Sequence, residues 1–489
     1  MLLCRVLADS WLVADFKRVW YNSFMKSMRI KKVVVVAFAV AAALEGFAAR
    51  PVPGEALARR LAEGPEVIGI VHWGLNTYTD REWGYGNEDP AMLAPSGFDA
   101  DQIVRACKSG GIGGLVIVAK HHDGFCLWPT KTTGHNITKS PFRGGRGDYV
   151  REMEQACRRA GLKFGVYVSP WDRNSEHYAT EKYVEMFNAQ LKELLGGDYG
   201  EVFEMWFDGA NGGTGWYGGA NERRTIGKDY YRFGEVVRMV RTIQPGITIF
   251  GGGNDGDFRW PGNERGLLDG DSRATIVAPD DPAYRELLNV GTPQGVCFKA
   301  CESDFPQRNG WFYHENERGS TKSAAYLMKL YLSSVGNGGT MDIGVAPNKA
   351  GVLDDADVRS LAGFGAIRQA FFSKEISPES GELFNVVVMS EDLSCGEQVD
   401  GWEFSADGQT LLRGKSIGVK RIRVLESAVA AKGCELKIVE AGEDLKGVSF
   451  RLYIADPELV RTVLAATTDS GETDTAKWMT LDNPLAPEE

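Results

Sequence analysis

The chain has 489 residues, more than one hydrophobic core usually serves, which predicts two domains. Its composition is that of a globular protein, with 43% hydrophobic and 25% charged residues. A formal net charge of −11 argues against nucleic acid or an anionic membrane surface as a partner.

The N-terminal stretch has the pattern of a secretory signal. Lys31 and Lys32 precede an unbroken apolar run over residues 33–44, and small residues follow. The run is too short to span a bilayer comfortably, so we expect no membrane span in the mature chain; an uncleaved anchor is the alternative. We therefore expect residues 1–49 to combine an over-called start, that is, a start codon assigned too far upstream, with a signal peptide at about residues 28–49. The protein is then secreted or periplasmic.

From about residue 67, strand and helix patterns alternate. One helix has Asp99 as a capping residue with Gln102 three positions later, and Gly161 ends another. The predicted elements, in chain order, are strands at 67–73, 114–119, 163–169, 202–207 and 247–251, and helices at 99–109, 149–160, 178–195 and 230–243. Strict alternation predicts a parallel sheet with right-handed crossovers. The length favours closure into a (β/α)8-like TIM barrel over an open doubly wound sheet.

The second half is less regular, and residues 252–320 are rich in glycine and proline. The later barrel elements are expected as strands at 274–277, 295–300 and 340–345 and a helix at 321–333. Past about residue 372, short strand patterns split by turn signals predict an antiparallel β-sandwich. We therefore expect a catalytic barrel at residues 50–371 and a C-terminal β-sandwich at residues 372–489.

Asp208 ends the short apolar run of the fourth strand and is followed by Gly209. Barrels keep their catalytic groups at the carboxyl ends of buried strands, so Asp208 is a candidate catalytic acid. The alternative is that it caps the next helix or turns the loop. The loops after the other strands bring further polar and aromatic residues to the same rim, namely His72, Trp73, His121, His122, Tyr167, Trp171 and Trp206.

Three chemistries fit such a rim. A metal site is disfavoured, because adjacent histidines on a strand point to opposite faces and His121 and His122 would not easily share one ion. Histidines that are simply satisfied inside the rim are the structural alternative. Glycoside hydrolysis needs two carboxylates across a sugar, with neutral histidines for the hydroxyls and indoles for the apolar face.

Several stretches resemble the α-L-fucosidases of glycoside hydrolase family 29. They are HHDGFCLWPTK at residues 121–131, WFDGA at 206–210 and HWG at 72–74. RWPGNERG at 259–266 and GWFYHEN at 310–316 are similar to the subgroup that acts on α-1,3/1,4-linked fucose. The resemblance runs from about residue 65 into the C-terminal β domain and implies a retaining mechanism.

The resemblance implies that Asp208 is the nucleophile and Glu264 the acid/base, with Glu302 and Glu315 as alternatives for the acid. Glu264 must then carry a proton when the glycosidic bond breaks. The resemblance further implies that the sugar is bound by His72, Glu82, His121 and His122 at its hydroxyls, by Tyr167, Trp206 and Trp311 around the C5-methyl group, by Arg259 near the reacting ring, and by Trp83 and Trp171, either of which could instead be rim packing.

We therefore expect a retaining α-L-fucosidase that needs neither metal nor cofactor. Its substrates would be oligosaccharides or glycoproteins that carry terminal α-1,3/1,4-linked L-fucose. The alternatives are a non-catalytic fucose-binding protein on the same scaffold, and a barrel glycosidase for another sugar.

Overall fold

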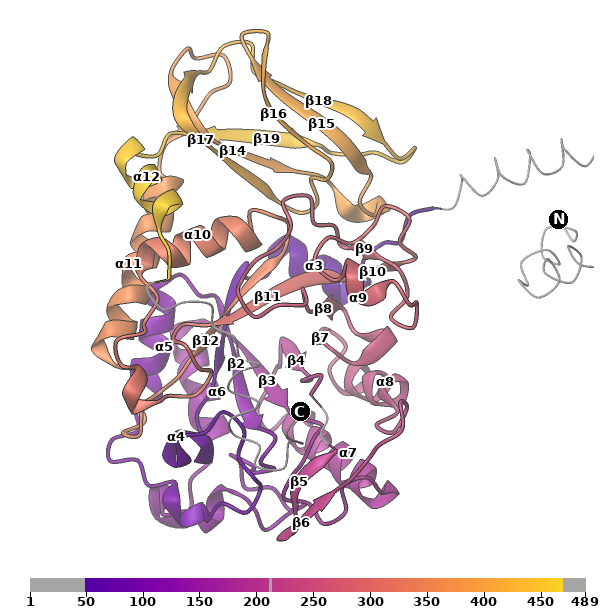
Figure 1. The fold of residues 1–489 in the computed structure, drawn as a ribbon, viewed down its shortest axis with the longest axis vertical. Helices are drawn as coiled ribbons and strands as arrows, with labels where there is room; N and C mark the ends of the chain where they lie inside the picture. Colours follow the sequence, from indigo (N-terminus) through magenta and orange to yellow (C-terminus); the bar gives the residue numbers. More distant parts are fainter. Residues whose placement is uncertain (1–48, 211–212, 469–489) are drawn as a thin grey trace, which may run out of the picture. The chain divides into compact units, whose positions relative to one another are not determined.

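The computed structural model describes residues 49–210 and 213–468. The predicted over-called start and signal peptide therefore lie outside the described residues, apart from Ala49. The described residues from Arg50 to Thr468 form one compact unit, in which a barrel is followed by antiparallel sheets (Figure 1). Within the described ranges, no helix is both long and apolar enough to cross a membrane.

In this part of the chain, eight parallel strands close into a barrel in chain order, and the last pairs with the first. The predicted (β/α)8-like barrel is therefore confirmed. The strands are β1 (Val67–Val71), β2 (Gly114–Lys120), β3 (Lys163–Val168), β4 (Glu204–Trp206), β7 (Thr248–Phe250), β8 (Phe258–Arg259), β11 (Ala300–Pro306) and β12 (Thr340–Val345). Most are continuous apolar runs because parallel strands are buried on both faces.

Helices cover the outside of the barrel, with α10 and α11 on one side and α7 and α8 on the other (Figure 1). The longer ones are α5 (Ala100–Ser109), α6 (Tyr149–Ala160), α7 (Glu181–Leu195), α8 (Phe233–Ile243), α10 (Ala324–Ser334) and α11 (Asp355–Phe371). Asp99 caps α5 by accepting a hydrogen bond from the Gln102 amide at 2.9 Å, and Gly161 ends α6 in the left-handed region, as predicted. Leu57 of α3 (Glu55–Glu63) packs into the cluster that fills the barrel interior.

Two predicted barrel strands are wrong. The segments at 274–277 and 295–300 contain β9 (Thr275–Ile276) and β10 (Cys297–Phe298), which pair with each other outside the barrel. The barrel strands in this region are β8, only two residues long, and β11, whose sequence ACESDFP carries acids instead of an apolar run. The periodicity of the sequence therefore gave no signal for either strand.

The remaining elements are short or belong to the C-terminal part. The short ones are α4 (Leu75–Thr79), α9 (Tyr284–Leu287), the hairpin β5 (Thr214–Tyr217) and β6 (Ala220–Arg223), and 3-10 turns at Pro90–Met92, Ile137–Lys139, Phe142–Gly145, Gly253–Asp255, Glu315–Glu317 and Leu393–Cys395. The C-terminal ones are β13 (Glu375–Ile376), β14 (Leu383–Ser390), β15 (Val399–Ala406), β16 (Gln409–Gly414), β17 (Arg421–Ala430), β18 (Glu435–Ala441), β19 (Ser449–Tyr453) and α12 (Pro457–Ala465).

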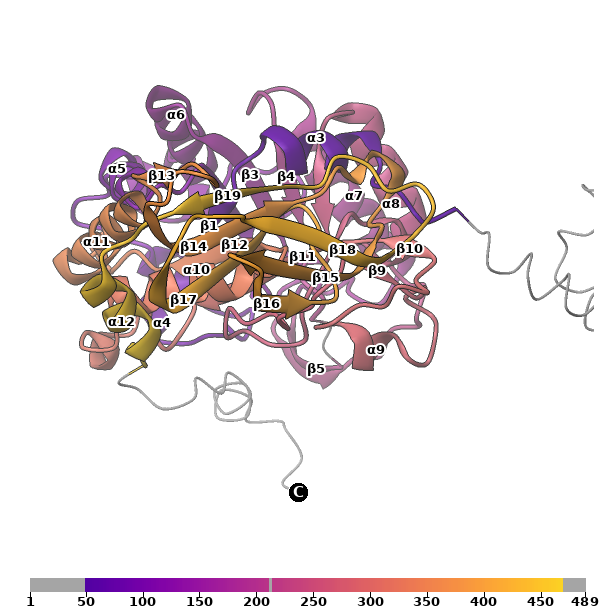
Figure 2. The same ribbon diagram turned by 90° about the horizontal axis from the view of Figure 1, so that it is seen from above.

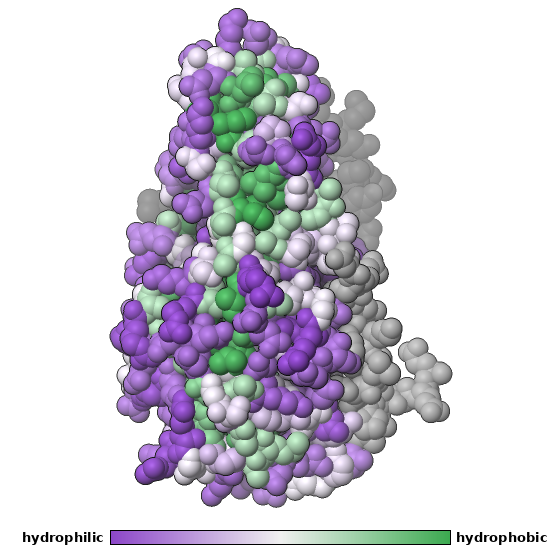
Figure 3. All heavy atoms as spheres, turned by 90° about the vertical axis from the view of Figure 1, so that its left-hand side faces the viewer, coloured by the Kyte–Doolittle hydropathy of each residue, from purple (hydrophilic) through white to green (hydrophobic). Residues whose placement is uncertain are grey.

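The C-terminal strands form two antiparallel sheets, β13-β19-β14-β17 and β16-β15-β18. Residues of both sheets, including Phe384 and Trp402, share one buried apolar cluster, so the sheets pack as a sandwich. We call this region, β13 to β19, the β domain; seen from above, its strands lie over the barrel (Figure 2). The face that carries α11 and α12 is mostly hydrophilic, with separate apolar patches (Figure 3).

Candidate active site

Asp208 lies two residues beyond β4, at the carboxyl end of the barrel strands. Its Oδ2 accepts a hydrogen bond from the Tyr167 hydroxyl at 2.7 Å, and Nε2 of His122 lies 3.7 Å from the same oxygen. Its Oδ1 accepts from the Ala210 amide at 2.7 Å, so Asp208 also turns its loop, as the alternative interpretation expected. It does not cap a helix, because α8 begins only at Phe233. One carboxylate oxygen thus shapes the loop while the other lies among the histidines and Tyr167.

His121 and His122 follow directly on β2, which ends at Lys120. Their ring centroids lie 4.1 Å apart, and the His72 ring lies 5.8 Å from that of His121. The expectation that the two adjacent rings face opposite sides is therefore wrong, since the strand alternation stops before them and Gly124 closes a turn onto the His121 carbonyl. In the described ranges, no group of three or more His, Cys, Asp or Glu is placed to hold a metal ion.

Burial keeps all three imidazoles neutral. It lowers the pKa of His72 to about 3 and that of His122 to about 4, and it holds the pKa of His121 well below its ordinary value. Nδ1 of His122 lies 2.7 Å from the Ser169 hydroxyl, which itself donates to the Trp171 carbonyl. Nδ1 is therefore the donor, and the lone pair of Nε2 points toward Asp208.

Aromatic rings build one wall of the site. Tyr167 stacks on His121 at 5.7 Å and on Trp206 at 5.3 Å, and Trp206 stacks in turn on Phe250 at 3.9 Å. On the other side of the histidines, Trp83 meets the His122 ring edge-on at 5.3 Å. The site therefore has apolar flat surfaces next to polar nitrogen and oxygen atoms.

Glu264 lies in the loop that follows β8, and Nε1 of Trp311 donates to its Oε2 at 3.2 Å. The Trp311 ring lies 5.1 Å from the ring of His72, which places Glu264 beside the histidine cluster. Asp304 on β11 is buried and is affected by the charges of both predicted catalytic acids. Its pKa is raised well above the ordinary value by burial first, and then by the charges of Glu264, Asp342 and Asp208. The negative charges of Glu264 and Asp208 thus both raise the pKa of Asp304.

The two alternative acids have other surroundings. Glu302 is fully buried inside the barrel, where its Oε1 accepts from the Trp206 indole at 3.1 Å. Glu315 is exposed and forms an ion pair with Arg318 at 3.0 Å. Neither carboxyl group joins the histidine cluster in the way that Glu264 does through Trp311.

Two predicted sugar ligands have structural partners. Glu82 accepts hydrogen bonds from the backbone amides of Trp311 and Phe312 at 3.0 and 3.2 Å, and from Nε2 of His314 at 2.7 Å, so it fixes the loop that carries Trp311. Arg259 is buried on β8, and its guanidinium donates to backbone carbonyls of the loop between β8 and β11. The structure therefore does not bring Arg259 to the site.

Sequence reasoning did not single out three residues that belong to the surroundings of the site. Phe312 lies 5.3 Å from His72 and 5.0 Å from His121, edge-on to both rings. Asp304 is buried on β11, where burial and the charges of Glu264 and Asp208 raise its pKa, and Nε2 of His314 lies 2.7 Å from Glu82. Phe312 and His314 are part of the GWFYHEN stretch, whereas nothing in the pattern around Asp304 distinguishes it.

Comparison with known proteins gives a consistent picture. The family model described as Alpha-L-fucosidase matches residues 55–369. Alpha-L-fucosidase 1 of Arabidopsis thaliana is 34% identical over 315 residues, which cover 63% of this chain and 59% of that protein. The crystal structure of a glycoside hydrolase 29 family member from an unknown rumen bacterium is 36% identical, with a TM-score of 0.77, and the match covers 83% of this chain and 78% of that one.

The structure of a Ruminococcus gnavus GH29 fucosidase in complex with fucose shares the fold at 24% identity with a TM-score of 0.72, over 84% of this chain and 96% of that one. The family match runs from the start of α3 into α11 and includes all eight barrel strands and the cluster around Asp208. The chain belongs to the alpha-L-fucosidases of glycoside hydrolase family 29, a family of enzymes.

Proposed function

We propose that this protein is a retaining α-L-fucosidase that releases terminal α-1,3/1,4-linked L-fucose through a fucosyl ester on Asp208. The observation that carries the proposal is the chain of contacts that joins two carboxylates at one barrel mouth. Asp208 is held by Tyr167 and lies beside His122, and Glu264 is held by Trp311, which packs on His72. Two carboxyl groups flanking one sugar are what glycoside hydrolysis requires.

In the first step, a carboxylate oxygen of Asp208 attacks the anomeric carbon while Glu264 gives its proton to the departing glycosidic oxygen. The bond from carbon to the aglycone oxygen breaks as the ester bond forms. In the second step, Glu264 takes a proton from water, which attacks the anomeric carbon and releases Asp208. A retaining pair stands about 5 Å apart, so that the nucleophile reaches the anomeric carbon directly. The Tyr167 hydroxyl and the Ala210 amide stabilise the negative charge of Asp208.

The neutral histidines provide the recognition of the sugar. His72 and His121 lie buried beside the Tyr167 ring, next to Asp208. The lone pair of Nε2 on His122 accepts from a sugar hydroxyl. A sugar that lacks the matching hydroxyls leaves these groups buried and unpaired, at a cost of about 1–3 kcal/mol each. The rings of Tyr167 and Trp206 provide the flat surface for the C5-methyl group.

The linkage preference rests on the likeness of RWPGNERG at 259–266 and GWFYHEN at 310–316 to the 1,3/1,4-acting subgroup. Digestion of fucosylated oligosaccharides that differ only in linkage tests it, and equal cleavage of an α-1,2-linked substrate contradicts it.

We further propose secretion or export to the periplasm, on the basis of the basic and apolar pattern at residues 31–44. N-terminal sequencing of the mature protein tests this, and an intact Met28 speaks against cleavage.

The chemistry is tested with aryl α-L-fucosides that have good or poor leaving groups. We expect Asp208→Ala to abolish turnover of both while fucose binding survives. Glu264→Ala slows poor leaving groups most, on the order of 10²-fold or more, and added azide partly restores the rate with a good one. Glu315→Ala is the matched control and keeps normal rates, since Glu315 is exposed and paired with Arg318. Near-normal turnover by Asp208→Ala, or uniform slowing by Glu264→Ala without rescue, contradicts the proposal.

A further inference from the structure

The loop that carries Glu264 is long and contains little regular secondary structure. Residues 260–299 connect β8 to β11 and contain the four-residue helix α9 and the strand pair β9 and β10. The connection that follows, from β11 to β12, contains the eleven-residue helix α10, whereas the preceding one, from β7 to β8, contains only the 3-10 turn Gly253–Asp255. A long helix satisfies its own backbone groups, whereas an irregular segment packed against a protein needs other partners for its carbonyls and amides. We call residues 260–299 the acid loop.

Arg259 supplies partners for the acid loop from the barrel side. Its guanidinium donates to the carbonyls of Leu288 at 2.9 Å and Ala274 at 3.4 Å, and also to those of Arg273 and Lys299. One buried cation thus binds carbonyls from the middle and the C-terminal end of the acid loop. These hydrogen bonds explain why Arg259 is buried, although the family resemblance implies that it lies near the reacting sugar ring.

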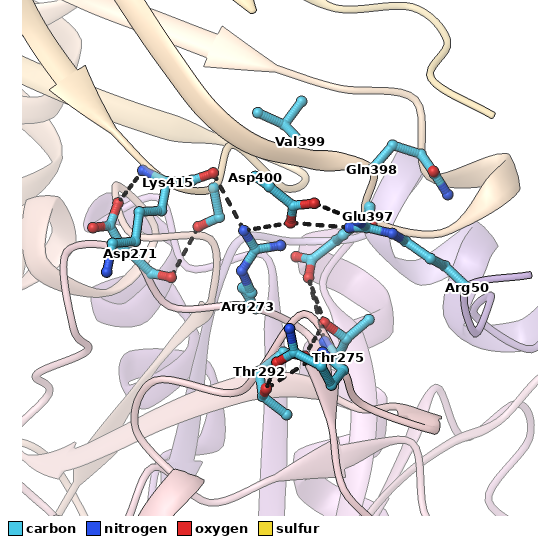
Figure 4. Close-up of polar contacts among 12 residues, drawn as sticks. Arg50, Asp271, Arg273, Thr275, Thr292, Glu397, Gln398, Val399, Asp400 and Lys415 are labelled. Carbon is cyan, nitrogen blue, oxygen red and sulfur yellow. Dashed lines mark hydrogen bonds and ion pairs between the residues drawn. The ribbon is translucent and has the colours of Figure 1, made fainter. Parts of the chain in front are cut away.

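The β domain supplies partners from the other side (Figure 4). The carboxylate of Glu397 accepts from the backbone amides of Ala274 at 2.8 Å and Thr275 at 3.3 Å. Asp400 forms an ion pair with Arg273 at 2.9 Å and is also bound by Arg50. Glu397 is only 3% exposed, so its charge is removed from water and depends on these donors.

Further contacts from the β domain hold the preceding residues of the acid loop. The amide of Lys415 donates to Oδ1 of Asp271 at 2.7 Å (Figure 4). The hydroxyl of Ser416 lies 2.9 Å from the carbonyl of Asp271 and 3.0 Å from that of Ser272. The fully buried guanidinium of Arg421 donates to the carbonyls of Gly270 and Ser272 at 2.9 and 2.8 Å. Residues 270–275 are therefore held along their length by side chains and backbone of another domain.

This held segment is connected to Glu264 through hydrogen bonds. The amide of Arg273 donates to the carbonyl of Val290, and the neighbouring Asn289 donates from Nδ2 to the carbonyl of Leu267 at 3.1 Å. Asn263 donates to the same carbonyl at 3.0 Å and closes the turn that presents Glu264. A displacement of residues 270–275 is thus transmitted to the turn on which Glu264 lies.

We propose that the β domain positions the acid/base of the active site, with Glu397 as a positioning residue that acts through residues 270–275 on Glu264. The inference rests on the proposed function of Glu264. The β domain takes the place of the absent helix: it satisfies the backbone of the acid loop and fixes where the loop presents its carboxyl group. Misplacing a catalytic group by about 1 Å can cost 10²-fold in rate, so modest loosening has a measurable effect.

The test compares Glu397→Gln with Glu403→Gln, a control on β15 of the same domain whose partner, Arg413 on β16, lies 2.8 Å away and outside the acid loop. For Glu397→Gln we expect kcat on an aryl fucoside with a poor leaving group to fall on the order of 10-fold, and kcat with a good leaving group to fall less than about 2-fold. Glu403→Gln should leave both unchanged. Equal slowing of both substrates by Glu397→Gln, or a lower unfolding temperature with normal rates, overturns the inference.

If Glu397→Gln does not fold, Asp400→Asn takes its place, and we expect the same difference between poor and good leaving groups. Glu264→Ala is measured in the same series, which separates the two proposals. If Glu264→Ala slows all substrates equally, the acid role of Glu264 is wrong, whatever Glu397→Gln does. If Glu264→Ala discriminates between leaving groups and Glu397→Gln does not, the acid role stands and the positioning by the β domain is wrong.

Discussion

His314 joins the loop that carries Trp311 to the loop after α4, and its contacts predict a specific pH dependence of stability. Its Nε2 lies 2.7 Å from Glu82 and its Nδ1 lies 2.8 Å from Asp80, so both nitrogens act as donors and the ring is cationic. Burial alone would lower the pKa of His314, but the hydrogen bonds and charges of Glu82 and Asp80 raise it from 6.5 to about 9.

A folded-state pKa above the unfolded value means that the stabilisation is fully present below pH 6.5 and is lost as the pH rises through 9. The rise in pKa corresponds to about 3 kcal/mol. Asp80 is 55% exposed, so screening by solvent reduces this to about 2 kcal/mol. For a folded protein of this size, that is about 2 °C in unfolding temperature.

The test is calorimetry of the wild type and His314→Gln at pH 6, 8 and 10. Glutamine keeps a neutral donor for Glu82, so the variant loses the charge and little else. We expect a gap of about 2 °C at pH 6 that closes by pH 10. His177→Gln is the matched control, since His177 pairs at 3.4 Å with Glu176, which is 72% exposed, and it should show no gap. A gap that stays constant or widens with pH refutes the reasoning.

Three further predictions concern the site and the β domain. Trp311→Phe removes the hydrogen bond to Glu264 and keeps a ring; we expect a loss of about 1.5–3 kcal/mol of transition-state stabilisation with poor leaving groups, and unchanged rates would contradict the contact at 3.2 Å. Because the pKa of His122 is lowered to about 4, the pH profile of kcat/KM should show no histidine titration near pH 6.5. A fall in kcat/KM below pH 6.5 that is present in the wild type and absent in His122→Asn would contradict the neutral state of His122. Trp402→Ala should cost about 3–5 kcal/mol of stability, because the ring is 1% exposed in the core of the β domain, and a change below about 1 kcal/mol in chemical denaturation would show that this core is not as described.

The first half of the barrel could be predicted from the sequence because its strands lie in largely apolar segments and its helices carry local signals such as Asp99 and Gly161. Those signals act within a few residues of the chain. β8 and β11 lack them: β8 has two residues, and β11 directs Glu302 and Asp304 into the barrel. Their place is set by pairing with neighbouring strands, and the spacing of apolar residues along one segment carries no information about that pairing.

In the site, too, residues in local motifs could be predicted from the sequence, whereas contacts between distant segments could not. The stretches around His121, Asp208 and Glu264 identified residues that the structure brings together. Two predicted sugar ligands have structural partners that lie far away in the sequence: Glu82 accepts from backbone amides about 230 residues later, and Arg259 donates to carbonyls of the acid loop. The rings of His121 and His122 do not alternate because both residues lie beyond β2, which ends at Lys120, and the strand predicted at 114–119 also ends before them.

The central claim is a covalent fucosyl ester on Asp208, and trapping it is the most direct test. A fucosyl donor with fluorine at C2 and an activated leaving group slows both steps but hydrolysis of the ester most, so a retaining enzyme accumulates the intermediate. We predict that mass spectrometry of the digested protein finds one fluorofucosyl group, on the peptide that contains Asp208. A label on another carboxylate, or an inactivated wild type whose Asp208 peptide stays unmodified, would contradict the account.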